Sequence, residues 1–551
     1  MAQGAGSGGR AVSRPQTLAA VVAAAGIVQL PTAAIVVALP TIHAEFNASM
    51  AELQWTVTAF YIPMSAMLIA SGRVADIFGR KRMLLIGCLL FGLGSAVAAA
   101  APDAQVLIAG IALTGIGGAL LMPASMSILT NVFTGERRGT AIGLWGGATE
   151  LISGVGIVVG GILTGELDWR WIFIVDIVVI AIVALLAWRG APESSDPQAT
   201  RDVDVPGVAL LITALTVLTL ALVQGATWGW GSTAIVALLA GAVVLFATFV
   251  VVERRTAHPI MSFDFFRRRN FAGATIVIFV LDFSFGALLF FLPLYFQEIL
   301  GYSPVEAGVL LLPLTGMMVI GSPLGGRIAA RVGQRPPIVI GLALITVSVF
   351  WISTLSLDTE FADLWLPTSL MGFGVGISLT AMNLAAMNAI SRHHAGAASG
   401  MLVTLSGLGA TLGVAVTGAV FNQLNLERTE ELTNQKAGVT INDAQAEELD
   451  GLLAGASDAE KTLDSIAGKA EAASVKDAVR EAFVSSLGTS LKIAAVLVLV
   501  GLILAVILIR RQDPVDDDDE LVKPPVAAPA HRPLPRHPHR WRWPARHPKP
   551  G

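Results

Sequence analysis

Charged residues and cysteine are both scarce in this chain of 551 residues. Only 14% of the residues are charged and 54% are hydrophobic, whereas a soluble domain is about a quarter charged. The single cysteine, Cys88, excludes an intramolecular disulfide and a cysteine metal cluster. A formal net charge of -4 offers no general basic surface for nucleic acid. These shortages exclude an ordinary soluble enzyme, a disordered protein and a disulfide scaffold, and they indicate a polytopic membrane protein.

Long apolar runs are what the sequence has instead. A run of roughly 18 or more apolar residues can cross a hydrocarbon core of about 30 Å as a helix. The runs are continuous, unlike the alternating strands of a membrane barrel. About fourteen spans are predicted, at 17–39, 54–71, 83–101, 105–127, 139–163, 171–188, 207–226, 232–252, 271–297, 304–329, 336–355, 363–390, 398–421 and 487–509.

Basic residues follow alternate spans and predict the topology. The loops that carry them include Arg80, Arg137, Arg254, Arg331 and Arg392. The intervening short loops carry mainly acids, with Arg170 as the main exception. This alternation places both termini in the cytoplasm of a cell whose plasma or inner membrane holds the protein, and it requires an even number of spans.

The chain is expected to divide into seven segments. Polar segment 422–486 is interpreted as a solvated amphipathic hairpin, with partner binding or pore capping as the alternative. The basic tail either stays solvated or rests on anionic lipid. The segments are a cytoplasmic N-terminus 1–16, an N-terminal six-helix half 17–190, a linker with two inserted helices 191–252, most of the C-terminal half 253–421, an extracytoplasmic loop 422–486, a last helix 487–511 and a disordered cytoplasmic tail 512–551.

Two turns on the predicted cytoplasmic side repeat one another. Residues 72–82 read GRVADIFGRKR and residues 326–335 read GRIAARVGQR, so that Gly, Arg, Ala and Gly align without gaps. Internal repeats of this kind are typical of secondary transporters, whose two related halves enclose a transport path. The repeat predicts two pseudo-symmetric halves, with the spans at 207–226 and 232–252 inserted between them.

The first turn resembles the G-x-x-x-D-x-x-G-R-[KR] signature of the major facilitator superfamily. Leu39-Pro40 at the end of the first span, Asp168-Trp169-Arg170 before the sixth and Trp228-Gly229-Trp230 after the seventh are similar to the fourteen-span drug:proton antiporter family. The resemblance implies an all-helical major facilitator fold of about 14 transmembrane helices and alternating access. It also implies export of small molecules driven by protons, with no enzymatic activity.

Two groups of residues in these motifs are expected to act mechanically. The turn is predicted to latch one conformation and release it in the other, although its basic residues could serve topology alone. Glycines of the fifth span are expected to let helices approach closely. The latch residues are Gly72, Asp76, Gly79, Arg80, Lys81 and Arg82, and the packing glycines are Gly143, Gly156, Gly160 and Gly161.

Two positions depart from the pattern of the family that the chain resembles. Pro31 stands where an acid is usual in the first span, and Ile111 stands where an arginine is usual in the fourth. Asp176 replaces an asparagine near the outer end of the sixth span, where an interfacial position is the simple expectation. These departures leave open whether transport uses the proton antiport that the resemblance implies.

Two other acids lie well inside predicted spans, Glu150 in the fifth and Asp282 in the ninth. A charge at mid-bilayer costs at least about 2.5–3.5 kcal/mol, so both are expected to face a central cavity. They are predicted to bind protons or a cationic substrate, with a hydrogen-bonded structural acid as the alternative. Weaker polar candidates, which could equally be interhelical hydrogen-bonding groups, are Gln29, Gln224, Asn383 and Asn388.

The sequence therefore predicts a monomeric secondary transporter that exports hydrophobic or amphipathic, neutral or cationic small molecules. Its expected partners are the substrate, protons and membrane lipid, with no nucleic acid, metal or cofactor. One alternative is export of an endogenous lipid or secondary metabolite without standard proton antiport. A more remote alternative is a non-transporting receptor or scaffold that uses residues 422–486.

Overall fold

The computed structural model describes residues 14–133, 136–195, 204–256, 263–390, 395–453, 457–467 and 471–510. Regular structure in these ranges is helical throughout, and none of them contains a strand. Helices are expected of long apolar runs because a backbone without access to water must satisfy its polar groups within the segment. The predicted tail 512–551 lies outside the described residues.

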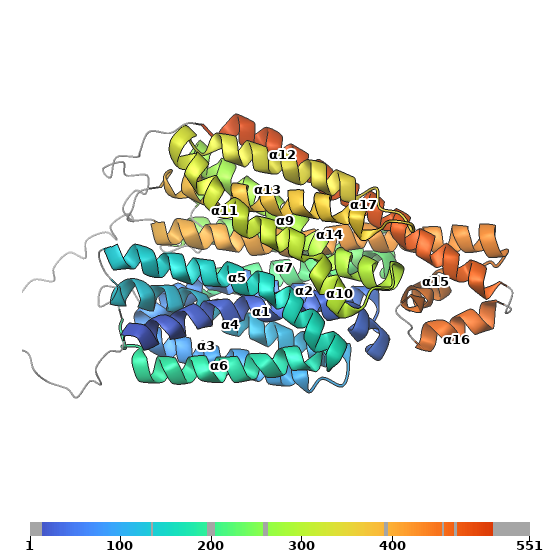
Figure 1. Cartoon of the computed structure of the whole chain (residues 1–551), viewed down its shortest axis with the longest axis horizontal. Helices are drawn as coiled ribbons and strands as arrows, with labels where there is room; N and C mark the ends of the chain where they lie inside the picture. Colours follow the sequence, from blue (N-terminus) through green and yellow to red (C-terminus); the bar gives the residue numbers. More distant parts are fainter. Residues whose placement is uncertain are drawn as a thin grey trace, which may run out of the picture.

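Six helices form the N-terminal half, drawn from blue to teal in Figure 1. Helix α2 begins at a capping box, in which Ser49 and Glu52 satisfy each other's backbone amides, and it ends before Gly79. The helices are α1 Arg14–Phe46, α2 Met50–Phe78, α3 Arg80–Ala99, α4 Ala104–Val132, α5 Glu136–Glu166 and α6 Arg170–Gly190.

The C-terminal half lies beside the first half and begins after a short 3-10 helix, η1 Phe263–Arg267. Its first long helix continues directly into a π-helix, and its last two long helices extend beyond the bundle. The elements are α9 Arg269–Leu294, η2 Tyr295–Ile299, α10 Pro304–Leu310, α11 Leu312–Val332, α12 Arg335–Ile352, α13 Phe361–Met387, α14 Ala395–Ala437 and α17 Ala472–Leu508.

The two inserted helices are α7 Val205–Trp228 and α8 Thr233–Arg255. Helix α7 packs against α2 of one half and α14 of the other, while α8 packs against α7. Only 17% of the apolar window of α8 is buried, compared with 78% of that of α1. The insert therefore lies at the seam between the halves, with α8 at the periphery and α1 at the centre.

Twelve helices in the described part of the chain are long and apolar enough to cross a membrane. Helix α2 adds a thirteenth if its segments Met50–Leu68 and Ala70–Phe78, which meet at 53°, form one span. Helix α5 covers the predicted span 139–163, but its apolar described part is the shorter Val155–Glu166. The fold class is confirmed, whereas the count of fourteen spans remains a prediction.

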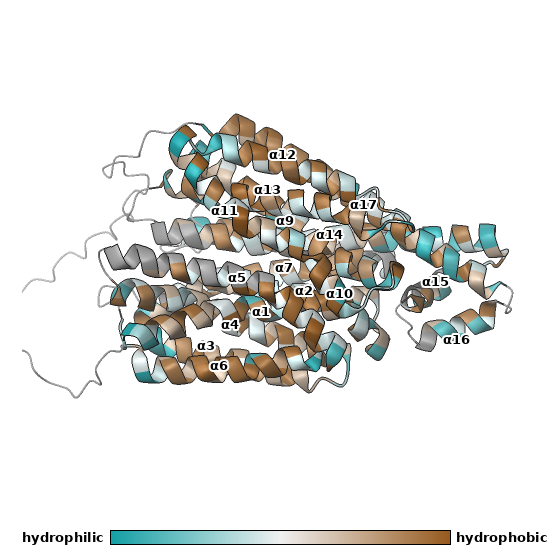
Figure 2. Ribbon diagram, viewed as in Figure 1, coloured by the Kyte–Doolittle hydropathy of each residue, from teal (hydrophilic) through white to brown (hydrophobic). Residues whose placement is uncertain are grey.

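The bundle has two chemically distinct ends. At one, which we call the basic end, the α2–α3 turn meets the chain after α6 through a bond from Arg80 N to Ser194 O. At the other, the α15 end, α14 and α17 continue outward and hold α15 Asp443–Leu449, η4 Asp450–Leu452 and α16 Ser457–Ile466. Figure 2 shows hydrophilic residues concentrated on these outer helices and apolar residues along the bundle.

The helices at the α15 end form a small domain with its own apolar core. Ile441, Leu449, Leu463 and Val479 are buried in it, and Arg428 on α14 donates to Ser485 and Thr489 on α17. Predicted spans 398–421 and 487–509 are thus the inner parts of longer helices. The helices continue because this second core supports them where lipid no longer does.

The two halves contact each other closely from the α15 end to the middle of the bundle. Gln297 Nε2 donates to Val37 O at 2.8 Å, and Gln54 on α2 donates to Asn422 on α14. Near the middle of α2, Thr404 on α14 donates to Ser65 O at 3.0 Å. Gly161 of α5 meets Pro304 of α10 on another side of the seam. These contacts seal the α15 end in this conformation.

Candidate functional site

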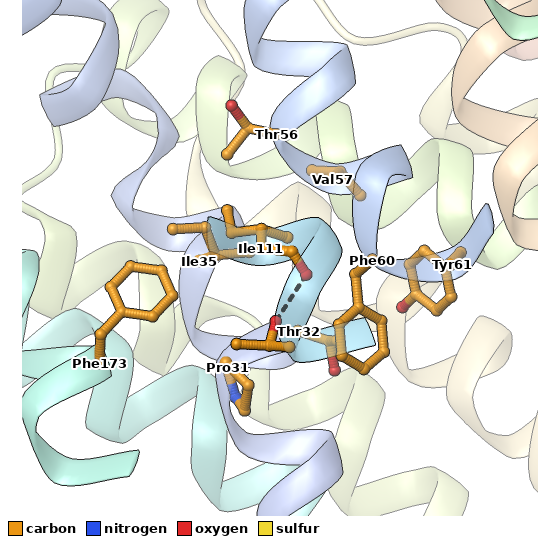
Figure 3. A pocket seen from close by; sticks show the side chains of 10 residues that line it. Pro31, Thr32, Ile35, Thr56, Val57, Phe60, Tyr61, Ile111 and Phe173 are labelled. Carbon is orange, nitrogen blue, oxygen red and sulfur yellow. Dashed lines mark hydrogen bonds between the residues drawn. The ribbon is translucent and has the colours of Figure 1, made fainter. Parts of the chain in front are cut away.

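A pocket lies inside the N-terminal half, between α1, α2, α4 and α6 (Figure 3). The gap between its walls is narrow in this conformation: its cavity volume is about 10 Å³, within about 290 Å³ of space between side chains that is partly open to solvent. Apolar side chains dominate its wall, and the polar groups are three threonine hydroxyls and one phenol. The lining residues are Pro31, Thr32, Ile35, Thr56, Val57, Phe60, Tyr61, Ile111, Thr114 and Phe173.

Local sequence features bring these walls together. Gly115 lets α4 approach α2, since a Cβ there would lie 2.4 Å from Phe60 O. Pro31 removes one backbone hydrogen bond of α1, and the next residue, Thr32, donates its hydroxyl to Gln29 O. The rings of Phe60 and Tyr61 meet edge to face at 5.6 Å. The pocket is therefore built from closely packed helices rather than loops.

The two departures from the family pattern occur together in this pocket. Pro31 on α1 and Ile111 on α4 both line it, and Ile111 is 5% exposed. The sequence identified each departure separately and could not place them in one site. The two positions at which the resemblance predicts an acid and a base therefore both hold apolar residues in one pocket. Neither replacement leaves a partner charge unpaired, which would be costly at such a position.

Asp282 brings an acid from the other half toward the same site. It lies on α9, is half-buried, and is close enough to Tyr61, which lines the pocket, to act on its phenol when ionised. This location is compatible with the predicted position of Asp282 at a central cavity. Binding of protons or a cationic substrate by Asp282 remains a prediction. Glu150 lies on α5, and its side chain is outside the described residues.

The four weaker polar candidates are not among the lining residues of the described pocket. Gln29 and Gln224 are half-buried on α1 and α7. Asn383 is exposed and donates its amide to Leu379 O, one turn earlier in α13. Asn388 is exposed at the C-terminal end of that helix. The Asn383 side chain therefore makes a local hydrogen bond within its own helix. Substrate contact by any of the four residues remains a prediction.

The turn between α2 and α3 forms an ionic cluster at the basic end. Asp76 pairs with Arg80 at 2.9 Å, and Arg82 lies 3.8 Å from Glu193. Lys81 donates its ammonium to Trp188 O at 2.7 Å. The cluster therefore links the turn to α6 and the segment after it, within one half. The part that Glu193 plays in this cluster was not predicted, because its partners Lys81 and Arg82 lie more than 100 positions away in the sequence.

The two glycines of this turn differ in what they require. Gly79 has a φ of +110°, and a Cβ there would lie 2.6 Å from a carboxylate oxygen of Glu193. A Cβ on Gly72 would meet Pro123 at 3.5 Å, which is ordinary contact. The predicted tight turn is thus observed at Gly79, while Gly72 does not need to be glycine for space in this conformation.

The glycines of α5 face two different partners. A Cβ on Gly156 would lie 3.1 Å from Ala33, and one on Gly160 would lie 2.5 Å from Ala34 Cα, so both face α1. Gly161 faces α10 of the other half, where a Cβ would lie 2.5 Å from Pro304 O. Gly143 is in α5, but its surroundings lie outside the described residues. One motif thus serves packing within a half and between halves.

We expect Gly160→Ala to destabilise the protein by about 1–3 kcal/mol, because the backbone of α1 or α5 must shift to admit the methyl group. The matched control is Gly316→Ala in α11, where nothing lies within 4 Å of the added Cβ. There the better helix propensity of alanine should leave stability unchanged or raised by up to about 1 kcal/mol. Thermal unfolding in detergent compares the two variants, and equal midpoints would contradict the tight α1–α5 contact.

Three further polar features escaped the sequence-based reading. His43 on α1 lies 3.1 Å from Glu298 on η2, and both side chains are 2% exposed. Gln54 meets Asn422 across the seam. Asp176 is fully buried on α6, and neither carboxylate oxygen has a hydrogen-bond partner among the described residues. The expectation that Asp176 is interfacial was therefore wrong, because its helix face turns toward the bundle. No cluster of metal-ligating residues occurs in the described ranges.

Known proteins resemble the chain in sequence and in fold. A sequence profile described as the Major Facilitator Superfamily matches residues 21–414. The tetracenomycin C resistance and export protein of Streptomyces glaucescens is 32% identical over 407 residues, which cover 73% of this chain and 75% of that protein. The multidrug efflux pump LfrA of Mycolicibacterium smegmatis is 29% identical over 88% of this chain and 94% of its own.

A solved structure supports the fold alone. It is a bacterial homologue of the human lysosomal transporter Spinster in an inward-facing and occupied conformation. It matches with a TM-score of 0.63 at 16% identity, covering 91% of this chain and 97% of its own.

Proposed function

Because the chain belongs to the Major Facilitator Superfamily, we propose that it is a secondary active transporter that exports hydrophobic or amphipathic small molecules by alternating access. The two relatives described above are named for export of an antibiotic and for multidrug efflux. The superfamily is one of transporters rather than enzymes, and a chain with at least twelve candidate spans is a multi-pass membrane protein.

The observation that carries the proposal is the chemistry of the pocket. Its apolar wall suits a hydrophobic compound, and a few hydroxyl groups can orient it. The nearby charge that acts on it is the acid Asp282, and Ile111 occupies the place of a base. This favours neutral and cationic substrates over anions, because a carboxylate near the pocket would repel an anion.

The conformation fits one stage of the proposed cycle. The contacts between the halves at the α15 end would block passage there. Under the topology predicted from the basic loops, that end faces outward and both termini face the cytoplasm. The state described would then accept substrate from the cytoplasm. The cluster of Asp76, Arg80 and Glu193 would hold α2, α3 and α6 together as one body while the halves move.

Accumulation of a fluorescent lipophilic cation tests the proposal. Cells that produce the protein are expected to hold several-fold less dye at steady state than cells that lack it. If protons drive export, an uncoupler should abolish the difference. Anionic dyes of similar size serve as the control, since they should accumulate equally in both cell lines. Equal accumulation of every dye class would contradict export of hydrophobic compounds.

A second candidate rests on the apolar pair Pro31 and Ile111. Without an acid and a base at these positions, the chain could export an endogenous lipid or secondary metabolite without standard proton antiport. Proteoliposomes with an imposed proton gradient distinguish the two candidates. Dye movement that follows the gradient supports antiport, whereas substrate movement that ignores it supports the second candidate.

A further inference from the structure

A histidine of one half faces a glutamate of the other at the α15 end. His43 Nδ1 on the last turns of α1 lies 3.1 Å from Glu298 Oε1 on η2. Both side chains are 2% exposed, so the pair is shielded from water on all sides. Each half supplies one member of the pair, His43 from α1 and Glu298 from η2. The pair therefore exists in this form only while α1 and η2 are in contact.

The backbone around Glu298 is unusual and fixed to α1 by a second contact. Residues 295–299 form a π-helix, in which Leu300 N donates to Tyr295 O. Such wide turns are frequently found at functional sites. The preceding residue, Gln297, donates to Val37 O at 2.8 Å. Two consecutive side chains of η2 thus reach across the seam to the same helix.

Other titratable groups at this end are engaged elsewhere. Glu45 pairs with Arg170 at 2.7 Å, and Glu306 caps its own helix through Ser303. Tyr295 donates its hydroxyl to Ser356 O. Arg480 on α17 donates to Ile299 O and is partly exposed, so solvent screens its charge. Other groups on neighbouring elements include Glu52, Glu166, Asp168, Tyr302 and Asp363, and all four of these acids are partly or fully exposed.

We propose that His43 and Glu298 form a proton-binding site that must hold one proton before the α15 end can close. A buried carboxylate beside a neutral imidazole would leave one uncompensated charge, which is strongly unfavourable. One bound proton makes the pair neutral overall, whether as imidazolium and carboxylate or as two uncharged groups. Glu298 Oε2 has no hydrogen-bond partner among the described residues, so the acid depends on His43 for stabilisation.

The sign of the pH dependence follows from this requirement. When the end is open, both groups meet water, and the imidazole is mostly neutral above about pH 6.5 while the carboxylate stays ionised. Closure then takes up one proton. The ratio of closed to open protein should therefore fall about tenfold for each unit of pH increase above 6.5. Below that value the pair already holds its proton, and the ratio should level off.

Distance measurements between spin labels test the site without any substrate. Pro102→Cys in the N-terminal half and Asp358→Cys in the C-terminal half place labels on exposed loops at the α15 end, and Cys88 is buried. In nanodiscs, the short distance should dominate at pH 5.5 and lose population toward pH 8.5. A label pair within one half, Pro102→Cys with Leu167→Cys, should show no change.

Two variants separate the proposed site from other causes of pH dependence. Glu298→Gln needs no proton to be neutral, so its closed population should no longer fall between pH 6.5 and 8.5. Below pH 6.5 its closed population should decrease instead, because closure would have to remove a proton from His43. His43→Gln leaves only the carboxyl to bind the proton, which should move the plateau to a lower pH and depopulate the closed state above it. Glu166→Gln, which removes an exposed acid from the same end, should behave as the unmodified protein.

The proposal rests on the two-state cycle of the proposed transporter, but the measurement distinguishes their failures. A distance distribution of the unmodified protein that is identical at pH 5.5 and 8.5, or a closed population of Glu298→Gln that still falls from pH 6.5 to pH 8.5, would overturn the proton site. If the dependence is observed and no dye is exported, the export proposal alone fails.

Discussion

The substitution Ile111→Arg is expected to remove about 3–5 kcal/mol of stability, and adding Pro31→Asp is expected to return most of it. Ile111 is 5% exposed in an apolar pocket, so a guanidinium there would be buried without a partner. A total stability of about 5–15 kcal/mol makes such a loss visible as poor yield and a lowered unfolding midpoint. Pro31 lines the same pocket, so a carboxylate there can pair with the new charge.

Two controls show whether charge pairing is the cause. Ile111→Met conserves volume and should cost less than about 1.5 kcal/mol. Pro31→Ala with Ile111→Arg removes the proline kink without supplying an acid, so it should stay as unstable as Ile111→Arg alone. If Pro31→Asp adds a further loss to Ile111→Arg, the two positions do not share one site. Thermal unfolding of these four variants, of Pro31→Asp alone and of the unmodified protein completes the double-mutant cycle.

Asp282→Asn is expected to lower the initial rate of export of a lipophilic cation at least tenfold. Truncating one partner of a buried charge pair typically costs 2–5 kcal/mol, and 1.4 kcal/mol corresponds to a factor of ten. The substitution keeps the size of the side chain and removes the charge that acts on Tyr61. Efflux from cells preloaded with dye, at matched protein levels, gives the rate.

A neutral substrate divides the two roles predicted for Asp282. If the acid binds only the cation, export of a neutral compound should be unchanged in Asp282→Asn. If it carries the coupling proton, export of both compounds should fall and lose its dependence on pH. The matched control is Asp358→Asn, an exposed acid between α12 and α13 that should leave both rates unaltered. Unchanged export of both compounds by Asp282→Asn would exclude both roles.

Much of the architecture could be predicted from the sequence because the relevant signals are local. Hydropathy along a single stretch is enough to place a helix, and the repeat at 72–82 and 326–335 indicates two halves. The φ of +110° at Gly79 follows from a glycine that separates two helices. The predicted spans 398–421 and 487–509 cover only the inner parts of α14 and α17. The outer parts of these helices depend on a second core, which is formed by residues far apart in sequence.

The contacts that give the site its chemistry could not be predicted in the same way. His43 and Glu298 are 255 positions apart, and neither has a neighbour that identifies the other. Asp176 is buried because of the direction in which one face of α6 points, which a nearly uniform apolar helix does not reveal. The shared position of Pro31 and Ile111 depends on how α1 and α4 meet at the pocket.

Helix α14 is continuous, so it connects the small domain at the α15 end mechanically to the C-terminal half. The helix has 43 residues, and the part from the middle of the bundle to Ala437 is a rod about 45 Å long. A tilt of 10° about the inner end of this rod would therefore move its outer tip by about 8 Å. Small rotations of the C-terminal half therefore move the small domain at the tip by a larger distance. A dye attached to α16 would report these movements during each transport cycle.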